Sequence, residues 1–201
     1  MVRYGPVSQP ERSKEPDLAA LAEAVALVKT DVPAAKAKFE ALVERGSIHS
    51  MVWLGTIYSW RVRPPNYELA AAWYQRASDA GSIDGGFRAG VVYSHLKKYD
   101  LALEAFERGA EHGYGPSLYL LARAYSLGRG VKVDFNKAIN LLWQADKAGH
   151  LLAKRLIGQY YMMGKAGIWN MPKGLALYVS SMPEIGRVYR EDRSDERLRT
   201  M

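Results

Sequence analysis

The sequence contains no cysteine, and this absence removes several kinds of site at once. Disulfide bonds, thiolate zinc sites and cysteine nucleophiles are all excluded, and a chain without cysteine suits a reducing compartment. Histidine is almost as scarce. The four histidines (His49, His95, His112 and His150) share no common spacing, whereas a protein metal site needs three or four convergent ligands. We therefore expect no metal and no other cofactor.

Long apolar runs are missing as well. No stretch approaches the roughly 20 consecutive apolar residues that a membrane-spanning helix needs. Residues 1–16 carry three prolines and scattered charges but no apolar core of a signal peptide, which predicts a disordered leader. We expect no membrane span and a cytoplasmic location.

Motifs of the common enzyme classes are also absent. The chain has no Gly-x-Ser-x-Gly nucleophile motif, no P-loop, no dinucleotide-binding fingerprint and no paired-histidine helix motif. The short segment Gly128-Arg129-Gly130 is not long enough to form a phosphate-binding loop. Because no catalytic residues converge, we expect a protein without enzymatic activity.

What the sequence does contain is a tandem repeat marked by glycine. Gly46, Gly81, Gly113 and Gly149 are separated by 35, 32 and 36 residues. If the residue after each glycine is counted as zero, position eight is always small and position eleven is always tyrosine. Alanine stands eleven residues before each glycine. Because position eight, position eleven and this alanine each recur four times, the sequence indicates a tandem repeat. These residues are Gly55, Gly90, Ala122 and Gly158 at position eight, Tyr58, Tyr93, Tyr125 and Tyr161 at position eleven, and the alanines Ala35, Ala70, Ala102 and Ala138.

Each unit has the pattern of two amphipathic helices joined by a turn. Between Gly113 and Gly149, apolar residues first recur with a helical period from Leu118 to Tyr125. A glycine-rich turn follows, and Asp134 is a candidate N-cap for the second helix. A small residue at position eight lets the two helices approach closely. We expect the tyrosine at position eleven to bury its ring between units.

These residues resemble the Sel-one-like repeat, a relative of the tetratricopeptide repeat. Its Leu-Gly-x-x-Tyr element is similar to residues 54–58, its Ala-x-x-Trp-Tyr element to residues 70–74, and its Gly-x-Gly-Val turn to residues 128–131. The likeness covers roughly residues 47–180, with a degenerate unit before it. The resemblance implies an all-α fold, namely a right-handed α-solenoid of about five helix-turn-helix repeats.

The repeats also set the expected domain organisation. Residues 17–183 should form the repeat domain. Its first helix pair lacks a glycine at position eight and a tyrosine at position eleven, as expected of a capping repeat. Residues 180–183 should end the last helix, because Pro183 lacks a backbone donor and clashes with the preceding turn. Residues 184–201 carry acidic residues and arginines in balance, and we expect a charged C-terminal tail or a capping segment there.

The resemblance implies a concave groove that binds a protein or peptide partner. Because bacterial relatives act in regulation, assembly and immunity, we expect a bacterial, non-enzymatic adaptor or scaffold. The net charge of +7 favours an acidic partner. The positions that the tetratricopeptide register assigns to the groove mix aromatic, cationic and polar side chains. Phe87 and Arg123 are expected to project into solvent, and the alternative is that position five of each unit belongs partly to the core. The groove positions are Val52, Thr56, Trp60, Phe87, His95, Tyr119, Arg123, Arg155 and Gln159.

Nucleic-acid binding is the alternative that the positive charge raises. Helical arrays of similar repeat length read one RNA base per repeat through polar side chains at fixed positions. Here the corresponding positions hold Val52, Phe87 and Tyr119, which form no polar code. We therefore favour a protein or peptide partner. The pattern leaves the identity of this partner and the oligomeric state of the chain open.

Overall fold

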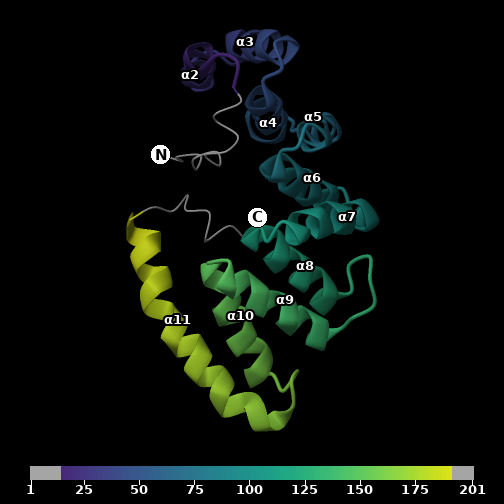
Figure 1. Ribbon diagram of the computed structural model, residues 1–201, viewed down its shortest axis with the longest axis vertical. Coiled ribbons are helices and arrows are strands. Elements are labelled where there is room, and N and C mark those ends of the chain that lie inside the picture. The colour runs from purple at the N-terminus through teal and green to yellow at the C-terminus, as the bar shows by residue number, and fades with distance from the viewer. Residues whose placement is uncertain (1–14, 192–201) are drawn as a thin grey trace. The chain divides into compact units, whose positions relative to one another are not determined.

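The computed structural model describes residues 15–191, and all regular structure in this range is helical. Helices follow one another along the chain with short connections (Figure 1). The all-α class and the helix-turn-helix repeats expected from the sequence are confirmed. The elements are α2 (Leu18–Leu27), α3 (Val32–Glu44), α4 (Ile48–Thr56), the π-helical turn η1 (Ile57–Arg61), α5 (Tyr67–Asp79), α6 (Ile83–His95), α7 (Tyr99–Glu111), α8 (Gly115–Leu127), α9 (Phe135–Lys147), α10 (Leu151–Met162), the 3-10 turn η2 (Ile168–Asn170) and α11 (Met171–Glu191).

The described residues divide into two compact units, residues 15–105 and residues 106–191, with the boundary inside α7. In the N-terminal unit, α3 packs against α2 and α4, and α5 packs against α4 and α6. In the C-terminal unit, α9 packs against α8 and α10, and α10 packs against α11 (Figure 1). Each unit therefore buries the apolar faces of its own helices against one another.

The helix ends confirm the turn chemistry expected from the sequence. All four repeat glycines have a positive φ, between 69° and 96°, which glycine adopts at little cost. Asp134 accepts a hydrogen bond from the Lys137 backbone N–H at 2.9 Å, as an N-cap does. Asp17 and Asp31 cap α2 and α3 in the same way, and Pro33 lies in the first turn of α3.

The glycine at position eight lies where the two helices of one unit touch. A Cβ added to Gly158 on α10 would lie 2.8 Å from the backbone oxygen of Gly174 and 2.8 Å from the backbone nitrogen of Tyr178, both on α11. A Cβ on Gly55 would meet the ring of buried Tyr74 at 2.7 Å. Because non-bonded atoms do not approach so closely, these contacts require glycine. The expected role of position eight is confirmed at both residues.

The tyrosines at position eleven differ from the prediction of rings buried between units. Only Tyr161 is buried, and the other three are partly exposed. A lysine amine lies over the ring in three units, at 4.1 Å from the ring centroid for Lys137 over Tyr125. The amphipathic ring thus packs on one side and faces a cation on the other. The further pairs are Lys36 over Tyr58 and Lys173 over Tyr161.

The folded part of the chain begins earlier than the predicted repeat domain. Residues 1–14 of the predicted leader lie outside the described residues, but Glu15 is fixed at the start of α4. Its carboxylate accepts hydrogen bonds from the Ser47 hydroxyl (2.7 Å) and the His49 backbone N–H (3.0 Å), and it also bonds Nδ1 of His49. Burial raises the pKa of the Glu15 carboxyl, but these hydrogen bonds outweigh it and lower the pKa below its usual value.

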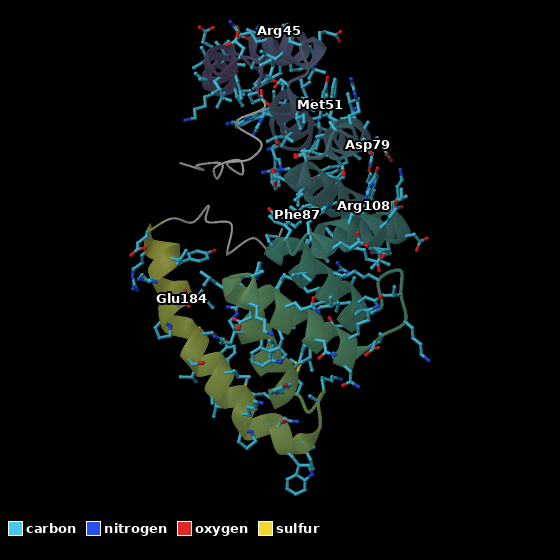
Figure 2. All side chains as sticks on the ribbon, viewed as in Figure 1. Arg45, Met51, Asp79, Phe87, Arg108 and Glu184 are labelled. Carbon is cyan, nitrogen blue, oxygen red and sulfur yellow. The ribbon has the colours of Figure 1, made fainter. Side chains whose placement is uncertain are left out.

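The last helix differs most from the prediction. The predicted end at residues 180–183 is wrong, because α11 continues through Pro183 to Glu191. Figure 2 shows Glu184 in this continuing part of the helix. Ile185 and Val188 are buried there, so apolar burial holds the helix beyond the proline. Residues 192–201 of the predicted tail lie outside the described residues.

Candidate functional site

In the N-terminal unit, part of the predicted groove belongs to the core. Phe87 is only 4% exposed, so its expected projection into solvent is wrong, and Thr56 is buried as well, at 2% exposed. The Thr56 hydroxyl donates to the carbonyl of Val52 at 2.9 Å and lies 3.0 Å from the hydroxyl of buried Tyr74. Val52 itself is partly buried against an apolar cluster. These side chains hold the unit together.

Two other predicted residues of this unit are exposed. Trp60, at the end of η1, is 60% exposed. His95 is exposed at the end of α6, and its ring stacks on Tyr67 with 5.6 Å between the ring centroids. Both keep the accessibility that a binding role would need, and that role stays a prediction.

In the C-terminal unit, the remaining four predicted residues come together. Tyr119 and Arg123 on α8, and Arg155 and Gln159 on α10, line one pocket of about 690 Å³. This volume falls within the roughly 300–1,000 Å³ typical of ligand sites. The pocket is therefore a concrete candidate site within residues 106–191.

Three helices each present one face to this pocket. On α10 and α11 the lining residues follow the spacing i, i+3, i+4, i+7, and on α8 they are four apart, as residues on one side of a helix are. They are Tyr119 and Arg123 on α8, Leu152, Arg155, Leu156 and Gln159 on α10, and Met182, Ile185, Gly186 and Tyr189 on α11.

Reasoning from the sequence missed the wall that α11 supplies. Pro183 indicates the end of a helix, so the sequence predicts a charged tail or a capping segment after it. A signal was nevertheless present, because Met182, Ile185 and Tyr189 continue a helical spacing of apolar residues across the proline.

Two arginines make the pocket cationic. Among residues 15–191, no carboxylate lies within ion-pair distance of Arg123 or Arg155, although Arg88 is paired with Asp84 at 2.7 Å. Burial raises the pKa of the Tyr119 hydroxyl, and the charges of both pocket arginines oppose that shift. The charges of both guanidinium groups therefore influence the same group, the Tyr119 hydroxyl.

Neighbouring contacts hold this part of the pocket in place. Tyr119 is 6% exposed, and its ring stacks on buried His150 with 4.5 Å between centroids and 20° between planes. Nearby, the Tyr160 hydroxyl donates to the Ser126 hydroxyl at 2.7 Å. Because Tyr119 is fixed by packing, it forms a rigid wall beside the arginines.

The described lining residues offer cations, hydrogen-bond donors and apolar surface, without a carboxylate or a histidine. This set can hold an anionic group through charge and hydrogen bonds while apolar surface packs beside it. Within residues 15–191, no three His, Cys, Asp or Glu side chains gather as metal ligands. The same range holds no helix that is both long and apolar enough to cross a bilayer.

Comparison with known proteins shows the repeat directly in the sequence. A family model of the Sel1 repeat matches residues 48–82 and 115–150. The putative sel1-like repeat-containing protein L21 of Acanthamoeba polyphaga mimivirus is 28% identical over 96 residues, which are 48% of this chain and 18% of that protein. The chain thus spans about a fifth of the length of this curated relative.

Solved structures share the fold. The c5321 protein, a protective antigen of uropathogenic Escherichia coli strains with an SLR fold, has a TM-score of 0.65 at 18% identity over 86% of this chain and 43% of its own. YrrB, a TPR protein described as having an unusual peptide-binding site, has a TM-score of 0.59 at 18% identity over 90% of this chain and 94% of its own. These likenesses confirm the solenoid class. The chain therefore contains Sel1 repeats at residues 48–82 and 115–150, and it shares the fold of SLR and TPR proteins.

Proposed function

We propose that the chain is a non-enzymatic adaptor that holds a segment of another protein in the pocket between α8, α10 and α11. Repeats of the Sel1 and TPR class generally mediate protein–protein interaction. The observation that carries the proposal is the convergence of Tyr119, Arg123, Arg155 and Gln159 on one pocket. The peptide-binding site named for YrrB is a property of that protein and is consistent with this use of the fold.

The composition of the pocket supports a protein segment over a small polar molecule. Aromatic residues and arginines are the side chains that most often anchor protein interfaces. Here exposed Tyr189 accompanies two arginines, buried Tyr119 forms the wall behind them, and Met182 adds a flexible apolar side chain that adapts to a partner. An extended segment could therefore bury apolar groups and pair charges at the same time.

The setting of the adaptor is also part of the proposal. A chain without cysteine suits the cytoplasm, which keeps thiols reduced. A bacterial source, and a role in regulation, assembly or immunity, are what the family resemblance led us to expect. Nucleic-acid binding stays the alternative, and no observation on the described residues favours it.

Site-specific crosslinking in the native host tests the proposal. Leu156, inside the pocket, is replaced by photoreactive p-benzoylphenylalanine in the full chain, and Gln144, exposed on α9 and outside the pocket, carries the same group as a control. We expect one protein to crosslink strongly at position 156 and weakly at position 144. The captured protein, once purified, should bind the unmodified chain.

Equal crosslinking at both positions, or crosslinking at position 144 alone, would contradict the proposed site. Recovery of nucleic acid in place of protein at position 156 would instead support the alternative. If the purified partner binds with unchanged affinity when Arg123 and Arg155 are both replaced by glutamine, its binding site lies outside the pocket.

A further inference from the structure

The two pocket arginines lie on neighbouring helices and face the same space. Arg123 is on α8 and Arg155 is on α10, and both line the pocket beside the Tyr119 hydroxyl. Neither has a carboxylate within ion-pair distance among residues 15–191. Two partly buried cations without a counter-ion repel each other, so an anion between them would be bound favourably.

The shape of arginine narrows the chemistry of that anion. A guanidinium group presents parallel N–H donors that match the two oxygens of a carboxylate. Gln159 adds a further amide donor on the same face of α10 as Arg155. Carboxylates are the anionic groups that protein segments carry without modification, so a pocket that holds a protein segment would take an aspartate or a glutamate.

Apolar side chains flank these donors on two helices. Leu152 and Leu156 accompany Arg155 on α10, while Met182 and Ile185 lie on α11. A phosphodiester backbone would leave this apolar surface without a partner. A polypeptide in which large apolar residues stand beside the acidic one would cover it.

We infer that the pocket recognises an internal acidic residue of its partner, whose carboxylate lies between Arg123 and Arg155 while an adjacent large apolar side chain packs against α10 and α11. The inference rests on the proposed function and specifies the chemistry of the segment that is held. Apolar surface on both α10 and α11 gives the chain on either side of the acidic residue a surface to cover.

Selection of displayed random peptides on the full chain tests this inference. One library presents the random segment internally, and a second presents it with a free carboxyl terminus. We expect the internal library to yield peptides in which Asp or Glu stands beside Leu, Met, Phe or Tyr. A synthetic copy with blocked termini should lose roughly tenfold or more in affinity when its Glu is changed to Gln, because hydrogen bonds to charged groups are the strong ones.

A pair of double variants separates specific recognition from general attraction. Arg123→Gln with Arg155→Gln removes the two pocket cations, and Arg187→Gln with Arg190→Gln removes two exposed cations of α11 that do not line the pocket. The net charge changes equally in both. We expect the double substitution in the pocket to lower the affinity for the acidic peptide roughly tenfold or more. The affinity for the Gln peptide should not change, because the arginines and the Glu carboxylate are coupled partners. The control pair should change both affinities little.

Each outcome decides between the two claims. Neutral peptides that crosslink at position 156 would overturn the inference and leave the proposed function standing. If acidic peptides bind the double variant at Arg123 and Arg155 as tightly as the control double variant at Arg187 and Arg190, the inference would also be overturned, because the attraction would then be general. Binding only from the library with a free carboxyl terminus would assign the carboxylate to a chain end and overturn the internal form. Failure of both selection and crosslinking would remove the inference together with the proposed function.

Discussion

At the scale of single residues, the repeat is held by contacts that leave no room for a side chain. Gly158 of α10 and Gly174 of α11 bring their backbones together, and a Cβ on either would meet backbone atoms at 2.7–2.8 Å. Backbone of a packed helix cannot move aside as a flexible side chain can. The close approach of the two helices therefore explains why a small residue recurs at position eight of the first helix and faces a small residue of the second.

We predict that Gly158→Ala destabilises the protein by about 1–3 kcal/mol, because the added methyl group forces the two helices apart. The matched control is Gly186→Ala on α11, where a Cβ would meet nothing nearer than the end of Arg190 at 3.9 Å. Alanine is the better helix former, so this change should be neutral or stabilising by up to about 1 kcal/mol. Urea unfolding measures both. Equal effects of the two substitutions would show that position eight is not a close contact.

Glu15 gives the stability of the N-terminal unit a dependence on pH. The folded-state pKa of this carboxyl is lowered below its ordinary value of 4.5, so its contribution is present above that value and is lost as the pH falls through the folded pKa. Glu15→Gln removes the charge. We expect the variant to be less stable than the wild type near neutral pH, and the difference to shrink as the pH falls below this ordinary value.

Denaturant unfolding at a series of pH values measures this difference. Glu44→Gln, at an exposed position of α3, is the control and should change stability little at any pH. A deficit of Glu15→Gln that stays constant with pH would mean that the Glu15 carboxylate is not the titrating group.

At the scale of elements, α11 shows how packing overrides a local signal. Pro183 cannot donate a backbone hydrogen bond, which costs a helix interior about 3 kcal/mol. Burial of Ile185 and Val188 on the far side offsets this cost, since a fully buried aliphatic side chain contributes about 1.5–3 kcal/mol. The helix therefore continues and supplies one wall of the pocket.

We predict that Val188→Asp releases the end of α11. Val188 is 2% exposed, and an unpaired carboxylate at such a position is strongly unfavourable. Hydrogen exchange of the amides of residues 184–191 should become fast, while the amides of α4 and α5 keep their protection. Val179→Asp, on the same helix but 59% exposed, is the matched control and should leave exchange unchanged. Unchanged protection in Val188→Asp would mean that burial of this residue does not hold the helix.

The helices, their caps and the close contacts could be predicted because they depend on local chemistry. Glycine at a positive φ and Asp134 at an N-cap are readable from residue type and spacing. The burial of Phe87 and the course of α11 could not be predicted in this way. They depend on which surfaces meet in three dimensions, and residue type alone does not distinguish a groove aromatic from a core aromatic.

At the scale of the whole molecule, the pocket arginines should contribute to binding and not to folding. Neither is paired with a carboxylate among residues 15–191, so the double change Arg123→Gln with Arg155→Gln removes repulsion and no ion pair. We expect the melting temperature of the variant to equal or slightly exceed that of the wild type in differential scanning calorimetry. A fall of several degrees would show that the arginines support the fold, and it would weaken their assignment to a ligand.

The measurement that tests the account most directly is a methyl-NMR titration of the full chain with a short acidic peptide. The probe is acetyl-Leu-Glu-Leu-amide, and its partner is acetyl-Leu-Gln-Leu-amide. Resonances of Leu152, Leu156, Met182 and Ile185 should shift with the Glu peptide and much less with the Gln peptide. Met51 of the N-terminal unit should not respond. Shifts of Met51 without shifts at the pocket methyls, or equal shifts with both peptides, would contradict the assignment of this pocket to an acidic protein segment.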